Sequence, residues 1–427
     1  MDLQSNPVNE ILYINFNQDF SCFVCGTANG FRVYNTDPFR LTYRRDFENG
    51  SGLGVIAMLF RTNILAFAGG GKSPRFPPHK VVLWDDRKAR VFAELSFRSA
   101  VKSVRLRRDL VVAVLNNKVY VYGIRTLSLF DSIETTNNPK GLCCLSVEGD
   151  RAVLVCPGMQ QGRALVIFYP RSFGDMHAPV ARERTNIIAA HESAIAAMSI
   201  DCTGTLLATA SDKGTILRVY DTAAGARLQE LRRGADRAEI HSLTFSLNGD
   251  WLAVSSDKGT IHIFAIGRAN PAAGVAGSSQ DSALPSNSKS SLQRLSRVLP
   301  AYFSSEWSLA QFRVPDYRCI AAFGKDPNTI VVVCANGSYY KARFDPVRGG
   351  EMIREEYAQF DDATVESSQS RDTEQLSRLA STALSEAQQA SPPDSEPVDE
   401  VQDEATPGSS TGPGKSHVPQ DVSDEQP

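Results

Sequence analysis

Internal repetition is the feature that most constrains the fold of this 427-residue chain. Residues 204–219 align with residues 249–264 at an offset of 45, and nine of the 16 aligned positions are identical. Each copy contains two strand-like runs joined by Ser-Asp-Lys-Gly, a sequence that favours a β-hairpin with glycine in the left-handed conformation. A period near 45 residues is typical of a propeller blade of four strands.

Weaker copies of the second run recur along the chain. Together with the two best copies they give seven runs, which end near residues 34, 84, 122, 169, 220, 264 and 343. One of them ends in Trp84-Asp85, the aromatic–aspartate pair that names WD repeats. The sequence therefore predicts an all-β, seven-bladed β-propeller of the WD-repeat type over residues 8–360. The last spacing is far too long for one blade, so we assign residues 267–312 to an insertion within blade six.

The insertion consists of two segments of different composition, and the end of the chain differs in composition from both. Residues 267–289 are rich in Ala, Gly, Ser, Asn and Pro and cannot pack a core. Large apolar and aromatic side chains return from residue 290, where Leu292, Leu295 and Leu299 share one helical face. Residues 361–427 are rich in Ser, Glu, Gln and Pro, and we predict a disordered acidic tail there.

Charge is distributed unevenly along the chain, although the net charge is only −3. Of 45 basic and 48 acidic residues, three and 15 lie from Asp361 onward, which leaves 42 basic and 33 acidic residues before it, a net charge of +9. A basic body with an acidic tail indicates a polyanionic partner. Both nucleic acid and an anionic membrane satisfy this criterion.

Several function classes are disfavoured. The eight cysteines are scattered through apolar runs, which is typical of buried thiols in a reducing compartment, and Cys22 and Cys25 lack a second pair to complete a zinc site. We expect no metal, no cofactor, no signal peptide and no spanning helix. Gly69–Ser73 resembles the end of a P-loop, but three nearby prolines forbid the helix that would hold phosphate. The sequence predicts a chain that is not an enzyme.

Two adjacent arginines, Arg232 and Arg233, lie between the two best repeats. On extended backbone neighbouring side chains point in opposite directions, so one pair serves two separate anion sites. The planar guanidinium donates two parallel hydrogen bonds to phosphate oxygens. The flanking hairpins offer matching hydroxyls and open glycines, namely Ser211, Gly214 and Thr215 in one and Ser256, Gly259 and Thr260 in the other. Alone, such a pair is usually a solvated surface feature; its setting favours binding.

These residues resemble the PROPPIN family, WD-repeat propellers that bind phosphoinositides in autophagy. The family hallmark F/L-R-R-G is matched by Leu231–Gly234, and the leucine resembles the branch of the two shorter mammalian members. Further similar motifs span residues 11–360: Phe16-Asn17-Gln18-Asp19, Gly30-Phe31-Arg32-Val33, Asp37-Pro38-Phe39, Trp84-Asp85-Asp86, Leu95-Ser96-Phe97, Asn138-Pro139-Lys140-Gly141-Leu142 and Leu299-Pro300 with Tyr302-Phe303-Ser304-Ser305 and Trp307-Ser308.

The resemblance implies two phosphoinositide sites on the rim around blades five and six. Site one would contain His191, Ser211, Gly214, Thr215, Arg218 and Arg232. Site two would contain Arg233, Ser256, Thr260 and His262. Lys213 and Lys258 rank lower, and we expect His241 to be structural. The implied ligands are phosphatidylinositol 3-phosphate and phosphatidylinositol 3,5-bisphosphate.

The remaining expectations concern membranes and partners. We expect Leu292, Leu295, Val298 and Leu299 to form a membrane-insertion loop, and Trp307 onward to pack on the outer face of blade six. The resemblance implies that the rod-shaped lipid-transfer protein of autophagy docks near Asn17 and Asp19. We expect a monomeric cytoplasmic scaffold, peripheral on preautophagosomal and endosomal membranes, that recruits the autophagy machinery to forming autophagosomes.

Two alternatives stay open. The first is a generic WD-repeat adaptor for proteins, in which the arginines are inert. The second is a nucleic-acid-binding propeller that uses the basic body, although we expect no nucleic-acid partner. Binding to RNA that is sensitive to salt and unaffected by loss of both arginines would favour the second.

Overall fold

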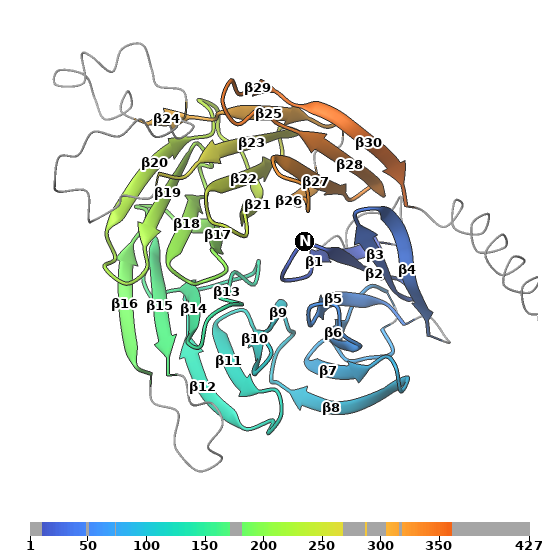
Figure 1. Cartoon of the computed structure of the whole chain (residues 1–427). Coiled ribbons are helices and arrows are strands. Elements are labelled where there is room, and N and C mark those ends of the chain that lie inside the picture. Colours follow the sequence, from blue (N-terminus) through green and yellow to red (C-terminus); the bar gives the residue numbers. More distant parts are fainter. Residues whose placement is uncertain are drawn as a thin grey trace, which may run out of the picture. The chain divides into compact units, whose positions relative to one another are not determined.

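The computed structural model describes residues 11–47, 51–72, 74–170, 182–267, 287, 305–315 and 318–360. These residues form seven β-sheets arranged around a central axis, which is a seven-bladed β-propeller (Figure 1). The described segments contain strands and no helix, and therefore no helix that could cross a bilayer. The predicted fold class is confirmed.

Each blade is built from four antiparallel strands in chain order. Blades one to three comprise β1 (Ile11–Phe16), β2 (Cys22–Thr27), β3 (Gly30–Thr36), β4 (Phe39–Asp46), β5 (Leu53–Met58), β6 (Ile64–Gly69), β7 (Lys80–Asp85), β8 (Arg90–Ser96), β9 (Ser103–Leu106), β10 (Leu110–Val114), β11 (Lys118–Gly123) and β12 (Leu129–Glu134). Blades four and five comprise β13 (Cys144–Leu145), β14 (Ala152–Pro157), β15 (Arg163–Tyr169), β16 (Arg184–Ala189), β17 (Ile195–Ile200), β18 (Leu206–Ser211), β19 (Ile216–Asp221) and β20 (Arg227–Arg232). Blades six and seven comprise β21 (Ile240–Phe245), β22 (Trp251–Ser256), β23 (Thr260–Ala265), β25 (Ala310–Arg313), β26 (Cys319–Phe323), β27 (Thr329–Cys334), β28 (Ser338–Arg343) and β30 (Ile353–Gln359).

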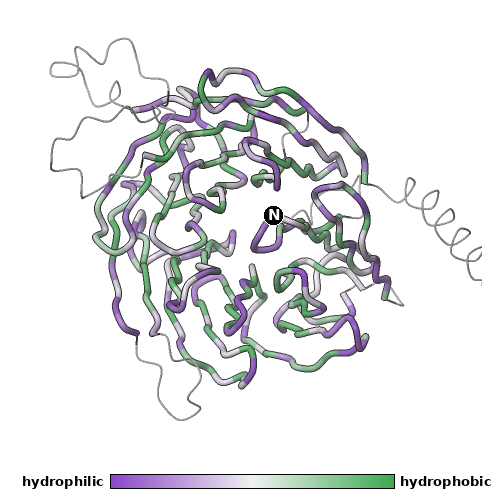
Figure 2. Tube along the Cα trace, in the orientation of Figure 1, coloured by the Kyte–Doolittle hydropathy of each residue, from purple (hydrophilic) through white to green (hydrophobic). Residues whose placement is uncertain are grey.

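The seven strand endings read from the sequence are the third strands of the seven blades, from β3 to β28. Second strands are buried on both faces, as in β14 and β18, and read as continuous apolar runs. Outer strands alternate between exposed and covered side chains, as β8 does. Figure 2 shows the hydropathy along the chain, with hydrophobic residues in many of the strands and hydrophilic residues in many of the connections.

Blade one comes wholly from the start of the propeller and blade seven wholly from its end, so the two blades share no strand. Side-chain contacts between them close the ring. The Tyr34 hydroxyl donates a hydrogen bond to the carbonyl oxygen of Phe360 at 3.1 Å. The Tyr339 hydroxyl donates to the carbonyl oxygen of Thr36 at 2.7 Å. The Phe39 and Tyr339 rings stack with centroids 4.3 Å apart. These contacts join the first and last blades in place of a shared strand.

The two repeated hairpins differ in register. In blade five Thr209 pairs with Arg218, whereas in blade six Val254 pairs with His262. The offset between the blades is therefore 45 in the second strand and 44 in the third. Because a one-residue slip reverses the face of every side chain, the structural counterpart of Arg218 is His262, not Ile263 as the repeat alignment implies.

The long connection between the third and fourth strands of blade six returns to the rim before it ends. A two-residue strand, β24 (Glu306–Trp307), pairs in parallel with β20 of blade five, and β25 follows as the outer strand of blade six. Another, β29 (Gly350–Glu351), pairs in parallel with β25. Residues 305–312, which the sequence assigned to the insertion, thus lie in or beside these strands, because alternate side chains such as Ala310 and Phe312 are buried.

Candidate functional site

Arg232 and Arg233 lie at the end of the outer strand of blade five. Arg232 is the last residue of β20 and pairs with Ile216, while the amide of Arg233 donates to the carbonyl oxygen of Thr215 at 2.9 Å. Both arginines are largely buried, with 3% and 7% of their surface exposed. Protein atoms therefore cover both side chains, and the pair is more than a solvated surface feature. Below, a groove means the seam between two neighbouring blades.

Site one lies between blades four and five. Thr209, Arg218 and Glu230 form a row across three strands, since each pairs with the next. Arg218 donates from Nη1 to the carbonyl oxygen of Ala190 in blade four at 2.7 Å and from Nε to Glu230 Oε2 at 2.9 Å. His191 Nε2 lies 3.0 Å from Thr209 Oγ1. This face of blade five therefore carries both cationic and anionic groups toward blade four.

His191 stays neutral in this groove near neutral pH. Burial lowers its pKa to about 4, and the neighbouring Arg218 contributes in the same direction. The groove thus offers guanidinium groups as its positive charges, together with an uncharged imidazole.

Arg232 lies two residues after Glu230 on β20, so its side chain is on the same face of blade five. Its guanidinium carbon lies 5.9 Å from the centre of the Trp307 ring, within the range of a cation–π contact. Trp307 pairs with Arg232 on the parallel strand β24. The end of the long blade-six connection is therefore attached directly to the arginine strand.

Site two lies between blades five and six. Arg233 donates from Nε to the carbonyl oxygen of Gly214 at 3.0 Å and from Nη2 to that of Asp236. Burial lowers the pKa of Arg233, although Asp257 and Asp236 oppose the shift. These carbonyl groups hold the guanidinium in place, and among the residues that the structure describes Arg233 forms no ion pair.

His262 faces the same groove from blade six. Its Nδ1 lies 3.1 Å from Ser308 Oγ, and Gln311 Nε2 donates to that hydroxyl at 3.2 Å. Burial lowers the pKa of His262 to about 4, with Arg233 acting in the same direction. His262 and Arg233 are therefore close enough for the charge of one to affect the ionisation of the other.

The hairpin turns show why glycine is needed beside these grooves. Gly214 has a φ of +62°, and a Cβ there would lie 1.9 Å from the carbonyl oxygen of Ala238. Gly259 has a φ of +65° in the matching turn. Only glycine adopts this conformation without strain while another backbone segment approaches so closely.

The structure distributes the predicted site residues over these two grooves, with some differences. Gly214, assigned to site one, contacts Arg233 of site two. Ser211 and Ser256 are buried at the hairpin turns, whereas Thr215 and Thr260 are half-buried. Sequence reasoning missed Glu230, Ser308 and Gln311. Glu230 could have been predicted from the sequence, because residues two positions apart on a strand lie on the same face and Glu230 precedes Arg232 by two.

The predicted partner surface is only partly on the surface. Asn17 is buried, and its Oδ1 accepts a hydrogen bond from the amide of Cys22 at 3.0 Å, so its side chain holds its own turn. Asp19 is half-buried and accepts from the Ser21 hydroxyl at 2.6 Å. Between them, Gln18 donates to the carbonyl oxygens of Met58 and Leu106 and thereby joins blades one, two and three. A role for Asn17 in partner binding would act through the shape of this turn.

The predicted membrane-insertion residues, Leu292, Leu295, Val298 and Leu299, lie outside the described residues. Trp307, expected to pack on blade six, pairs instead with blade five, because β24 crosses to the neighbouring outer strand. Glu306 of the same strand accepts hydrogen bonds from Gln229 at 3.1 Å and Asn287 at 2.8 Å.

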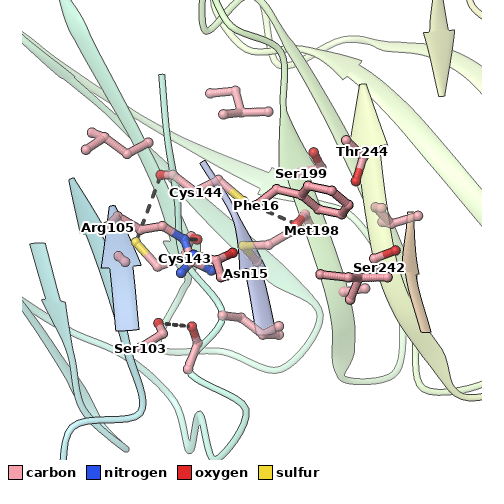
Figure 3. Close-up of a pocket in the computed structure, with 18 of the residues that line it drawn as sticks. Asn15, Phe16, Ser103, Arg105, Cys143, Cys144, Met198, Ser199, Ser242 and Thr244 are labelled. Carbon is pink, nitrogen blue, oxygen red and sulfur yellow. Dashed lines mark hydrogen bonds between the residues drawn. The ribbon is translucent and has the colours of Figure 1, made fainter. Parts of the chain in front are cut away.

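A cavity of about 710 Å³ runs along the inner strands (Figure 3). Arg105 lines it and donates to the carbonyl oxygen of Cys143 at 2.9 Å, and Cys144 Sγ lies 3.2 Å from the carbonyl oxygen of Met198. His241 also lines the cavity, and burial lowers its pKa. The described residues contain no cluster of three or more potential metal ligands. The contacts within this cavity hold neighbouring blades together.

Comparisons with known proteins agree with this architecture. The profile of the PROPPIN family matches residues 11–356. Autophagy-related protein 18e of Arabidopsis thaliana is 38% identical over 354 residues, which cover 82% of this chain and 88% of that protein. Autophagy-related protein 18 of Dictyostelium discoideum is 34% identical over 353 residues, which cover 80% of this chain and 91% of that protein.

Two solved structures share the fold. Kluyveromyces lactis Hsv2 has a TM-score of 0.62 at 23% identity, covering 82% of this chain and 99% of that chain. In a complex of KlAtg21 with the coiled coil of AgAtg16, one chain has a TM-score of 0.59 at 20% identity and covers 82% of this chain and 100% of its own length.

Proposed function

Because the chain belongs to the PROPPIN family, we propose that it is a non-enzymatic scaffold that binds phosphoinositide headgroups and docks on membranes in autophagy. The observation that supports the proposal most is that Arg232 and Arg233 are both buried at the end of one strand, where Arg232 lies beside Trp307 and Arg233 donates to the carbonyl oxygen of Gly214. The implied ligands are phosphatidylinositol 3-phosphate and 3,5-bisphosphate.

Two weak sites on one rigid body favour a membrane over a free headgroup. Once the first site has bound a lipid, the second binding event becomes intramolecular, so the apparent affinity exceeds that of either site. The grooves are separated by one blade, and both face lipids only if the propeller stands with this part of its rim against the bilayer. We propose that Leu292, Leu295, Val298 and Leu299 insert beside them.

We further propose that the propeller recruits a protein partner. The rod-shaped lipid-transfer protein of autophagy would dock at the turn of Asn17 and Asp19, on the side of blades one to three. Gln18 ties that turn to two neighbouring blades and so makes the surface rigid before binding. The site of action would be cytoplasmic, on preautophagosomal and endosomal membranes.

Flotation with liposomes tests the lipid-binding proposal. The wild-type chain should float with vesicles that contain phosphatidylinositol 3-phosphate, and the variant carrying both Arg232→Thr and Arg233→Thr should stay in solution. Phosphatidylcholine vesicles alone provide the lipid control. If the double variant floats as the wild type does, the adaptor alternative gains support and the proposal fails.

A further inference from the structure

The register of the blades makes the two grooves equivalent, residue by residue. Glu230 on the outer strand of blade five pairs with Arg218, and Gln311 on the outer strand of blade six pairs with His262. Since Arg218 and His262 are themselves counterparts, Glu230 and Gln311 occupy the same position in their blades. One groove therefore carries a carboxylate where the other carries an amide.

The carboxylate of Glu230 is bound within site one. Its Oε2 accepts from Arg218 Nε at 2.9 Å and from Arg227 Nη1 at 3.0 Å, and its Oε1 accepts from the Ser305 hydroxyl at 3.2 Å. Only 16% of the side chain is exposed. A carboxylate with these donors occupies hydrogen bonds of the kind that phosphate oxygens use.

Site two has no carboxylate at the position of Glu230, although Asp257 and Asp236 of the neighbouring turns interact with the charge of Arg233. Gln311 is neutral and donates to Ser308, and Arg233 forms no ion pair within the described part of the chain. Two residues beyond Gln311, the exposed Arg313 pairs with Thr260 of the predicted site. Glu351 pairs with Gln311 one strand further out, but it is exposed, and solvent screens its charge.

We infer that the outer-strand residue of each groove sets how much negative charge the groove accepts. Glu230 limits site one, because a phosphate must displace its carboxylate from Arg218 or bind against its repulsion. Gln311 leaves site two open to a more highly charged headgroup. The inference rests on the proposed function and deepens it, since it assigns the bisphosphate to site two.

The inference is tested by replacing Glu230 with glutamine and Gln311 with glutamate. Each change is made in a chain in which substitution of one arginine has inactivated the other groove. Arg233→Thr leaves site one, and adding Glu230→Gln should raise binding to vesicles containing phosphatidylinositol 3,5-bisphosphate by about five- to tenfold, the effect of one like charge removed at close range. Arg232→Thr leaves site two, and adding Gln311→Glu should lower binding by a smaller factor, because position 311 is exposed and solvent screens the added charge. Glu94→Gln removes another ion-paired carboxylate from an outer strand, in blade two, and should change nothing.

The outcomes distinguish failure of the inference from failure of the proposed function. If the wild-type chain does not bind the vesicles above the phosphatidylcholine background, the proposed function fails. If both single-groove chains bind and Glu230→Gln leaves binding unchanged or weaker, the inference is overturned while the proposed function stands. Soluble inositol 1,3,5-trisphosphate separates headgroup from membrane: the same gain is expected with it, and a gain seen only with vesicles would place the effect outside the groove. Thermal unfolding of each variant excludes loss of fold as the cause.

Discussion

Tyr34 of blade one donates a buried hydrogen bond to the carbonyl oxygen of Phe360 at the end of blade seven, 3.1 Å away. The two residues are 326 positions apart, and their rings also pack with centroids 5.1 Å apart. Closure of the ring therefore depends on a local set of aromatic and polar contacts, because the first and last blades exchange no strand.

Tyr34→Phe should lower the free energy of unfolding by about 1–2 kcal/mol, because a buried carbonyl group loses its partner while the ring packing remains. Urea denaturation measures the change. Tyr357→Phe removes a hydroxyl from the same end of the propeller at an exposed position and should have little effect. Equal losses from the two variants would contradict the role of Tyr34 in closure.

Gly214→Ala should destabilise the protein and weaken headgroup binding together. The new Cβ would collide with the carbonyl oxygen of Ala238, and Arg233 depends on the carbonyl of Gly214 for its position. A loss above about 1 kcal/mol is expected for alanine at positive φ in a tight backbone contact. Gly267→Ala is the control, because a Cβ there would meet no atom closer than 3.7 Å and the residue lies outside the L-R-R-G hallmark. The prediction is wrong if both alanines are tolerated equally.

Stability should fall on mild acidification because of His262. Its pKa is lowered from 6.5 to about 4 in the folded state, so between these values the unfolded chain binds a proton that the folded chain does not. The free energy of unfolding therefore decreases as the pH falls from about 6.5 to about 4. Denaturation across this range should show a shallower slope for His262→Gln than for the wild type. Identical slopes would show that the imidazole titrates freely.

Trp307→Leu should weaken site one and spare site two, because the ring lies against the Arg232 guanidinium. A partly exposed cation–π contact predicts a loss of about two- to fivefold. Vesicle binding by chains with one working groove measures it, with Phe92→Leu on the outer strand of blade two as an aromatic control. An equal loss in both grooves would indicate a general effect of β24 on the rim.

The blades could be predicted because their signals are local. Turn glycines such as Gly214 and the alternation of strand residues act within a dozen positions, so the repeat predicts each hairpin. Which side chains share a groove could not be predicted in the same way. In blade six the paired residues of the hairpin are one position closer in sequence than in blade five. This shift exchanges the two faces of the third strand, so that His262 is the counterpart of Arg218.

Other parts of the site depend on contacts that no local pattern encodes. Trp307 reaches blade five because β24 crosses to the next outer strand, a pairing 75 residues from Arg232 in sequence. Asn17 is polar and was expected at the surface, yet its side chain is buried in its own turn. Glu230 could have been assigned to the face of Arg232 from strand periodicity alone.

The stoichiometry of headgroup binding shows whether Arg232 and Arg233 serve two separate sites. Isothermal titration of the full chain with soluble inositol 1,3-bisphosphate should give two bound headgroups for the wild type. It should give one for Arg232→Thr, one for Arg233→Thr and none for the double variant. A single headgroup for the wild type, or loss of all binding in either single variant, would contradict the claim that each arginine belongs to its own groove.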